Sequence, residues 1–148
     1  MKKVMPREEY CLGCQLCEIA CAVEHSKSKD VVTAMKYEEP KPLARTRVEI
    51  EGDTMLSLSC RHCDDAPCLT VCMGGALYRD ADGAVRHNPE RCVGCWMCVM
   101  VCPYGALSRS ADVSKAIAVK CDFCPDRSMP ACVEACPNGA LVLVEVDV

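Results

Sequence analysis

The residues best suited to chemistry are sixteen cysteines, about one residue in nine of this 148-residue chain. They fall into four groups of four, and none is left over. The groups are Cys11-x2-Cys14-x2-Cys17-x3-Cys21, Cys60-x2-Cys63-x4-Cys68-x3-Cys72, Cys92-x2-Cys95-x2-Cys98-x3-Cys102 and Cys121-x2-Cys124-x7-Cys132-x3-Cys136. Thiolates are ligands for soft metal ions, so four complete sets indicate metal sites.

The first and third groups have the spacing that holds a cubane iron–sulfur cluster, and Pro103 completes the pattern in the third. Three thiolates spaced three residues apart on a looping backbone reach three corners of one cube. The fourth cysteine lies on or beside a helix, faces away and reaches a different cluster. Four complete groups therefore predict four [4Fe–4S] clusters.

Zinc and disulfide bonds are the two alternatives. Structural zinc usually takes two C-x2-C pairs that are a dozen or more residues apart, whereas here a third cysteine follows after two residues in two groups. Disulfides require export, and the N-terminus has two lysines but no apolar leader segment. We therefore expect a metal protein of the reducing cytoplasm, with no membrane span.

Short elements must position these cysteines. Cysteine is followed by x-x-Gly-Ala-Leu in three copies, Cys72–Leu77, Cys102–Leu107 and Cys136–Leu141, where glycine turns the chain and Ala-Leu begins a strand. The pattern predicts hairpins over 47–58, 76–87 and 106–119, and a strand over 141–146 that pairs with residues 2–5. Helical turns are expected at 18–25 and around Cys68, Cys98 and Cys132. Residues 22–45 carry no cluster signature, and either a partner-docking arm or a connecting loop fits them.

The composition agrees with an α+β fold built around inorganic cores. One Phe and one Trp are too few large side chains for a chain of this length, so the clusters would occupy that volume and supply folding free energy. A net charge of −4 argues against a nucleic-acid surface. No GxGxxG or phosphate-binding loop is present, so we expect an electron carrier that is not an enzyme on its own.

Over nearly its whole length the chain resembles the four-cluster ferredoxin-like electron-transfer subunits of anaerobic oxidoreductases. It is most similar to the iron–sulfur subunit associated with CO dehydrogenase, on the strength of Cys21-Ala-Val-Glu-His-Ser26 and the following Lys-Ser-Lys-Asp30. Related subunits serve tungsten aldehyde oxidoreductases, formate dehydrogenases and hydrogenases. The resemblance implies an electron-transfer protein that carries one electron at a time between such a catalytic partner and a second donor or acceptor.

The resemblance also implies that the first group pairs with the fourth, and the second with the third. The four ligand sets are then Cys11, Cys14, Cys17 and Cys136; Cys121, Cys124, Cys132 and Cys21; Cys60, Cys63, Cys68 and Cys102; and Cys92, Cys95, Cys98 and Cys72. Residues 1–45 with 112–148 form an outer ferredoxin-like module, and residues 46–111 form an inner one. Two tandem ferredoxins remain the alternative, and the outer pair of clusters is expected to face the two partners.

Several residues beside the ligands have two interpretations each. Arg61, Arg91 and Lys120 either offset cluster charge or serve as exposed solubility charges. Trp96 is expected to pack rather than relay electrons, and His25 and His62 are expected not to be ligands, since every site has four thiolates. Two further hypotheses stay open, a zinc-binding interaction module and self-assembly of the chain into a conductive scaffold.

Overall fold

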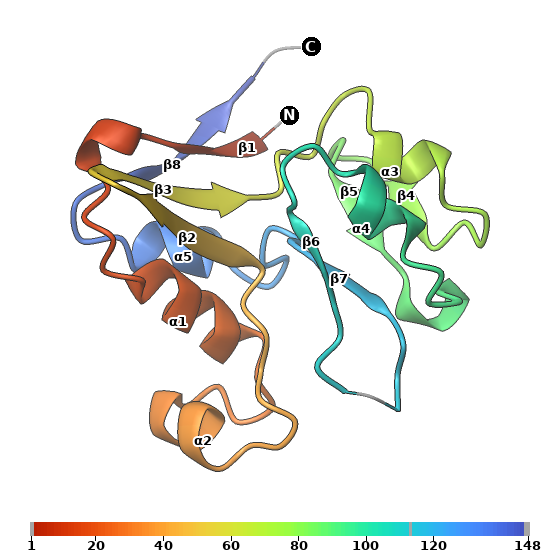
Figure 1. Ribbon diagram of the computed structural model, residues 1–148, viewed down its shortest axis with the longest axis horizontal. Coiled ribbons are helices and arrows are strands. Elements are labelled where there is room, and N and C mark those ends of the chain that lie inside the picture. The colour runs from red at the N-terminus through yellow and green to blue at the C-terminus, as the bar shows by residue number, and fades with distance from the viewer. Residues whose placement is uncertain (1, 113, 147–148) are drawn as a thin grey trace.

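A computed structural model describes residues 2–112 and 114–146 as an α+β protein of short elements (Figure 1). In chain order these are β1 (Lys2–Pro6), η1 (Glu8–Tyr10), α1 (Leu16–Glu24), α2 (Val31–Lys36), β2 (Thr46–Glu51), β3 (Thr54–Ser59), α3 (Pro67–Thr70), β4 (Leu77–Arg79), β5 (Val85–His87), η2 (Pro89–Arg91), α4 (Met97–Val101), β6 (Leu107–Arg109), β7 (Ala118–Lys120), α5 (Ala131–Glu134) and β8 (Leu141–Glu145). The α+β class and the expected helical turns are confirmed.

Each strand in this part of the chain pairs with one other, which gives four two-stranded antiparallel sheets. β1 pairs with β8 in the register Lys2↔Glu145 to Pro6↔Leu141, so the predicted pairing of the terminal strands is confirmed. The hairpins β2–β3, β4–β5 and β6–β7 are the three that the turn signals predicted. Isolated two-stranded sheets are only marginally stable, so their stability must come from what packs between them.

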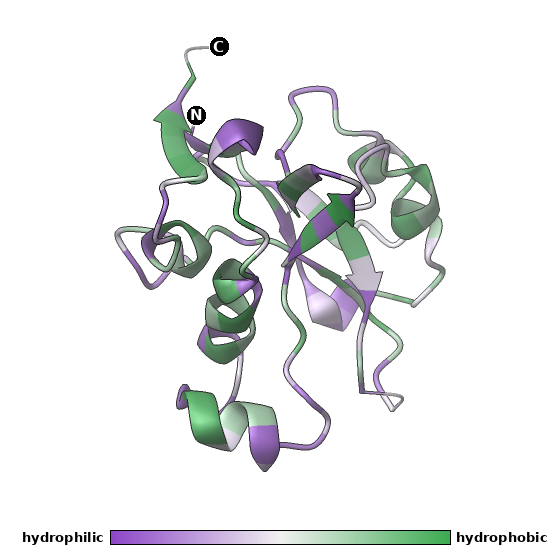
Figure 2. Ribbon diagram, turned by 60° about the vertical axis from the view of Figure 1, so that its left-hand side comes forward, coloured by the Kyte–Doolittle hydropathy of each residue, from purple (hydrophilic) through white to green (hydrophobic). Residues whose placement is uncertain are grey.

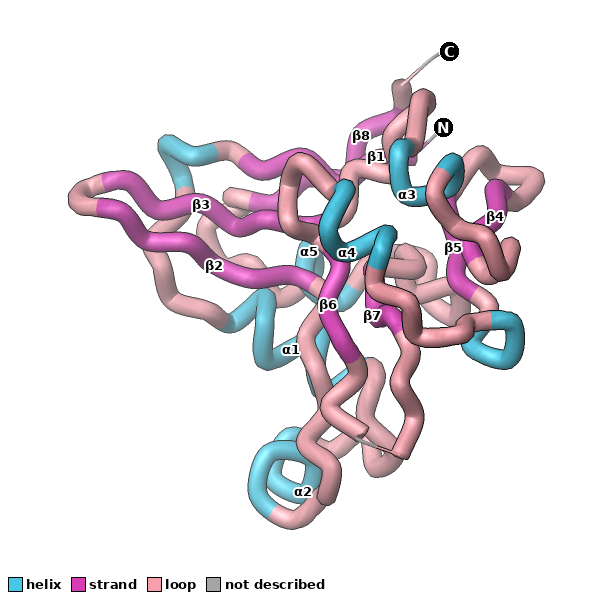
Figure 3. Tube along the Cα trace, turned by 45° about the vertical axis from the view of Figure 1, so that its right-hand side comes forward, coloured by secondary structure: helices cyan, strands magenta, loops and turns pink. Residues whose placement is uncertain are grey.

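The elements gather in two lobes on either side of Figure 1. In one lobe α1 packs against α5, and the β2–β3 hairpin lies against α1, β1 and η1. In the other, α3 packs against α4, and β5 lies beside β7. The long β2–β3 hairpin points away from β4 and β5 in the side view (Figure 3).

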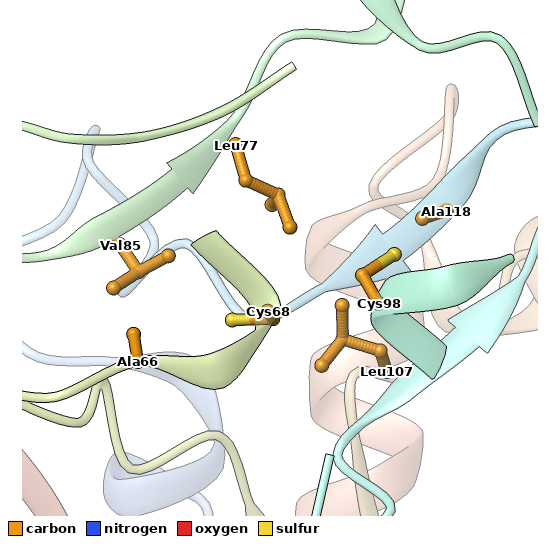
Figure 4. Packing of buried hydrophobic residues seen from close by; sticks show 7 residues of the cluster. All are labelled: Ala66, Cys68, Leu77, Val85, Cys98, Leu107 and Ala118. Carbon is orange, nitrogen blue, oxygen red and sulfur yellow. The ribbon is translucent and has the colours of Figure 1, made fainter. Parts of the chain in front are cut away.

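Each lobe has its own small hydrophobic core. One core consists of Ala66, Cys68, Leu77, Val85, Cys98, Leu107 and Ala118, drawn in Figure 4. The other consists of Val4, Cys17, Cys132 and Leu141. Cysteines belong to both cores, and hydrophobic residues occur in short stretches over both lobes rather than in one central layer (Figure 2). The protein therefore has few large apolar side chains because its interior is divided into two small cores, and cysteines form part of each.

The stretch between Ala22 and Arg45 contains a helix that the sequence did not predict. Asp30 is the N-cap of α2, and its side chain accepts a hydrogen bond of 2.8 Å from the backbone N–H of Thr33. α2 packs against α1 and buries Ala34 completely. The connecting-loop interpretation is therefore wrong for residues 31–36, because a six-residue helix is too short for its hydrophobic period to stand out. Within residues 2–112 and 114–146, no helix is both long enough and apolar enough to cross a membrane.

Candidate iron–sulfur sites

Three cavities in the protein are each lined by four cysteines. The sets are Cys11, Cys14, Cys17 and Cys136; Cys60, Cys63, Cys68 and Cys102; and Cys72, Cys92, Cys95 and Cys98. The three cavities are alike in size. Equal donor sets around them are what three copies of one inorganic group require. In each, three cysteines come from one group and the fourth comes from another.

The four remaining cysteines, Cys21, Cys121, Cys124 and Cys132, also lie together. All four are buried. Burial raises the pKa of the Cys132 thiol, and repulsion from the thiolates of Cys121, Cys21, Cys124 and Cys17 raises it further. Repulsion of this kind acts between nearby sulfurs, and Cys17 already belongs to the first cavity. Here again one cysteine of the first group joins three of the fourth.

The loops that carry the cysteines share a backbone feature. The residue before the second cysteine of each group has a positive φ, namely Gly13 (64°), His62 (44°), Gly94 (68°) and Phe123 (63°). Glycine adopts this conformation without strain, whereas an L side chain pays roughly 1–2 kcal/mol for it. The same turn in four loops, twice at a cost, indicates that the backbone must curl around something at each site.

The thiols need a positive partner to ionise. Burial raises the pKa of Cys68 to about 11 and that of Cys121 to about 12, and nearby thiolates add to both shifts. The pKa values of Cys17, Cys63, Cys98 and Cys124 are also raised, in each case chiefly by burial. A thiol with such a pKa stays protonated at neutral pH unless a metal ion replaces the proton.

Backbone amides supply part of the sulfur environment. The N–H of Ala106 lies 3.4 Å from Cys102 Sγ, and the N–H of Ala140 lies 3.2 Å from Cys136 Sγ. These are the cysteine and alanine of the repeated Cys-x-x-Gly-Ala-Leu motif, so the glycine turn serves to aim an amide at the sulfur. Burial disfavours the Cys136 thiolate, but the amides of residues 138–141 outweigh it and lower its pKa.

The residues present fit [4Fe–4S] clusters. All sixteen cysteines are free, so they form no disulfides. The Nε2 atoms of His62 and His87 are buried without a hydrogen-bond partner in the described chain, and each histidine lines one of the four-cysteine cavities. An unsatisfied buried polar atom costs about 1–3 kcal/mol, so these atoms are expected to find a partner that belongs to the site.

The charged residues beside the ligands differ in burial. Lys120 is only 3% exposed, and its Nζ donates hydrogen bonds to the carbonyl oxygens of Val85 and Cys121. The solubility interpretation is therefore wrong for Lys120. Arg61 instead lies over the ring of Tyr104, 4.6 Å from its centroid. Arg91 is exposed, and its guanidinium lies against Gly75.

Trp96 packs at the edge of a site. It lines the cavity that includes Cys95 and Cys98, and the guanidinium of Arg109 lies 5.1 Å from its ring centroid. This placement agrees with a packing role, because the indole covers one wall of the cavity while a cation covers the indole.

His25 belongs to a buried polar network that the sequence did not reveal. Its Nε2 donates to Asp122 at 3.1 Å, and its Nδ1 donates to the Cys21 carbonyl at 2.7 Å. Burial alone would lower the pKa of His25, but hydrogen bonds with Asp122 and with both the sulfur and the carbonyl oxygen of Cys21 raise it to about 9. Asp122 also accepts from Arg45 and from the amide of Cys124. With both ring nitrogens in hydrogen bonds, His25 has no free atom for a metal.

Asp122 and Ser57 were missed for different reasons. Asp122 lies between two ligands in the sequence, so its position was a usable signal. Ser57 lies on β3, 40 residues away from Cys17 in the chain, yet its Oγ is 3.4 Å from Cys17 Sγ. Only the packing of β3 against the first group brings these two atoms together.

An α+β fold of paired short strands around four-cysteine sites defines the class as a small iron–sulfur protein. Residues 53–146 match the family described as "4Fe-4S dicluster domain", and the chain belongs to this family. A dicluster domain holds two [4Fe–4S] clusters, and the sixteen cysteines suffice for four. The predicted cofactor type is thereby confirmed.

Curated relatives agree with this membership. The chain is 40% identical to an "Iron-sulfur protein" of Rhodospirillum rubrum, over 94% of this chain and 80% of that one. It is 38% identical to "Electron transport protein HydN" of Escherichia coli, over 91% and 83% of the two chains. It is 36% identical to "Thiosulfate reductase electron transfer subunit PhsB" of Salmonella typhi, over 95% and 73%. The names of HydN and PhsB describe electron transport, which agrees with the carrier role that the sequence predicted for this chain.

One solved structure extends the comparison to the fold. A chain of the "Active site complex BamBC of Benzoyl Coenzyme A reductase", solved with 1,5 dienoyl-CoA, superimposes with a TM-score of 0.55. The match covers all of this chain and 78% of that chain, at 23% sequence identity. At this identity the similarity concerns the fold alone.

Proposed function

We propose that this protein is an electron-transfer subunit that passes electrons one at a time between a catalytic oxidoreductase and a second redox partner. When bound, each [4Fe–4S] cluster accepts and releases a single electron. The observation that carries the proposal is the set of three equal cavities, each lined by four free cysteines, in a chain of an iron–sulfur family. The polypeptide's task is to hold the clusters, exclude water from them and set their potentials.

For the ligands we propose four sets, one of them made of Cys21, Cys121, Cys124 and Cys132. The other three are Cys11, Cys14, Cys17 and Cys136; Cys60, Cys63, Cys68 and Cys102; and Cys72, Cys92, Cys95 and Cys98. The cavity linings and the thiolate repulsion at Cys132 support this division. The contacts of α1 with α5 and of α3 with α4 support it independently, since these helices carry cysteines of the paired groups.

The same contacts support two ferredoxin-like modules. The outer module contains both chain ends, and the inner module contains the second and third cysteine groups. We propose that the β2–β3 hairpin belongs to the outer module, because it contacts α1, β1 and η1. β7 belongs to the inner module, because it pairs with β6. The boundaries then fall near residues 60 and 120, rather than at 46 and 111.

Electrons would enter and leave beside Cys14 and Cys95, the two cysteines that are exposed. Their neighbours Leu12 and Val93 are 64% and 71% exposed, so each has apolar surface for a partner around it. Cys14 belongs to an outer site and Cys95 to an inner one. This assignment replaces the expectation that the two outer sites face the two partners, and the buried sites at Cys121 and Cys68 would connect the ends.

For the catalytic partner we propose an enzyme of the CO dehydrogenase type, on the sequence from Cys21 to Ser26. The similarity to a thiosulfate reductase subunit supports the broader class of oxidoreductases, which includes aldehyde oxidoreductase, formate dehydrogenase and hydrogenase. We place the protein in the cytoplasm because sixteen free thiols suit a reducing compartment.

Anaerobic purification followed by metal and redox analysis tests the function. We expect about sixteen irons per chain, four for each of four clusters, and low-potential EPR signals on reduction. An iron-free protein with stoichiometric zinc would instead establish the zinc-binding interaction module. The protein that co-purifies identifies the catalytic partner, and light scattering that shows only small particles would exclude the self-assembled scaffold.

A further inference from the structure

His62 is the most deeply buried polar side chain beside a candidate cluster site. It directly precedes Cys63, and none of its surface is exposed. Its Nδ1 accepts a hydrogen bond of 3.0 Å from the backbone N–H of Val85. An imidazole nitrogen that accepts a hydrogen bond carries no proton, so the ring proton is on Nε2. The backbone contact therefore fixes the tautomer.

The Nε2–H group of His62 is a hydrogen-bond donor without an acceptor among the described residues. Nε2 of His62 is buried and has no hydrogen-bond partner in the described part of the chain. The ring stacks on Phe123, with centroids 3.9 Å apart and planes at 21°, so it has little freedom to turn. The stacked ring and the hydrogen bond from Val85 therefore hold a buried N–H donor in place.

The surroundings of His62 suggest the acceptor. His62 lines the cavity whose four cysteines are Cys60, Cys63, Cys68 and Cys102. Apart from the cysteines, the only acceptor among the side chains that line this cavity is the Tyr104 hydroxyl, and it makes no hydrogen bond with Nε2. The sulfur atoms of a cluster are acceptors, and hydrogen bonds to them set its potential.

We propose that His62 Nε2–H donates a hydrogen bond to the sulfur of the cluster held by Cys60, Cys63, Cys68 and Cys102, and raises the reduction potential of that cluster. The inference rests on the proposed function, since it requires a cluster at this site. An N–H dipole beside sulfur stabilises the extra negative charge of the reduced state more than that of the oxidised state. His62 is thus a tuning residue, and it leaves the ligand set complete.

His87 does not support the same argument. Its Nε2 is likewise buried without a partner in residues 2–112 and 114–146, and it lines the cavity with Cys72 and Cys92. No hydrogen bond to its Nδ1 fixes the position of the ring proton, so the donor is not assigned. His25 differs again, because both of its ring nitrogens have partners within the protein.

Two substitutions separate the donor from the rest of the side chain. In His62→Asn the amide oxygen can still accept from Val85 N–H, and asparagine tolerates a positive φ, but no group reaches the place of Nε2. In His62→Gln an amide N–H can reach that place. His62→Gln is therefore the matched control for His62→Asn.

The reduction potentials are measured by EPR-monitored redox titration of fully loaded protein. We expect one cluster of His62→Asn to become about tenfold harder to reduce, a fall of about 59 mV for one electron. His62→Gln should keep nearly native potentials. A His62→Asn protein with full iron content and unchanged potentials would overturn the inference. A native protein without iron would instead refute the proposed function.

A second measurement does not depend on how well the asparagine variant folds. In native protein labelled with ¹⁵N-histidine, pulsed EPR of the reduced state should detect hyperfine coupling to a protonated ring nitrogen. His62→Gln should lose the part of that coupling that comes from His62, because its donor is unlabelled and only His25 and His87 keep the label. Absence of the coupling in the native protein, or identical couplings in the native protein and in His62→Gln, would overturn the inference.

Discussion

The sharing of ligands between the two ends of the chain can be tested with paired cysteine substitutions. Cys11 and Cys136 come from the first and the fourth groups, yet they line one cavity. Cys132 lies only four residues before Cys136 but belongs to a different set in the proposed division. Replacing Cys11 and Cys136 together should therefore damage one site, whereas replacing Cys11 and Cys132 should damage two.

The number of irons that each double variant should retain follows from the number of sites that keep four thiolates. Cys11→Ala/Cys136→Ala leaves three complete sets and should retain about 12 irons in intact clusters, four for each. Cys11→Ala/Cys132→Ala leaves two complete sets and should retain about 8. A site with three cysteines can keep a smaller cluster, so Mössbauer spectroscopy of intact [4Fe–4S] clusters is the appropriate assay rather than total iron.

The comparison of the two double variants controls for general instability, because each loses two buried or half-buried thiols. Only two intact clusters in Cys11→Ala/Cys136→Ala would refute the shared site. That result would indicate that Cys136 serves another set, as in an arrangement of two tandem ferredoxins. The reasoning from the cavity linings would then fail for the other sites as well.

Three further predictions concern the supporting structure. Gly94→Ala should lower the unfolding free energy by about 2–5 kcal/mol in denaturant titrations, because its Cβ would lie 2.2 Å from the Ala116 carbonyl oxygen at a φ of +68°. Gly139 has a similar φ but open space around it, so Gly139→Ala should lower the unfolding free energy by only about 1–2 kcal/mol. Equal losses of unfolding free energy in the two variants would contradict the clash at Gly94. Lys120→Met should make a neighbouring cluster about tenfold harder to reduce, a fall of about 59 mV in its reduction potential. Lys115 is exposed, so Lys115→Met should leave the potential unchanged. An unchanged potential in Lys120→Met would show that the buried charge is compensated elsewhere. Removal of iron with a chelator should abolish the cooperative thermal transition followed by circular dichroism, and a native-like transition in iron-free protein would show that the two small cores suffice.

The local parts of this protein were predictable from the sequence alone. Ligand chemistry depends on residue type and short spacing, so the sixteen cysteines identified the cofactor without any fold. The hairpins and the helical turns beside Cys68, Cys98 and Cys132 were predictable for the same reason, since glycine turns and strand alternation act over a few residues. The helix at Val31–Lys36 was missed because its signal is too short.

Contacts between distant segments were decided only by the tertiary structure. The pairing of β1 with β8 brings Cys11 and Cys136 to one cavity, and the placement of β3 brings Ser57 to Cys17. The stacking of His62 on Phe123 joins residues of the two lobes in the same way, and the packing of β7 beside β5 buries Lys120 against Val85. A charge or a ring beside a cysteine looks the same in the sequence whether it is exposed or buried. The sequence therefore determined which cluster the protein binds, and the packing of the two lobes determines which side chains surround each cluster, because hydrogen bonds and burial depend on distance in space.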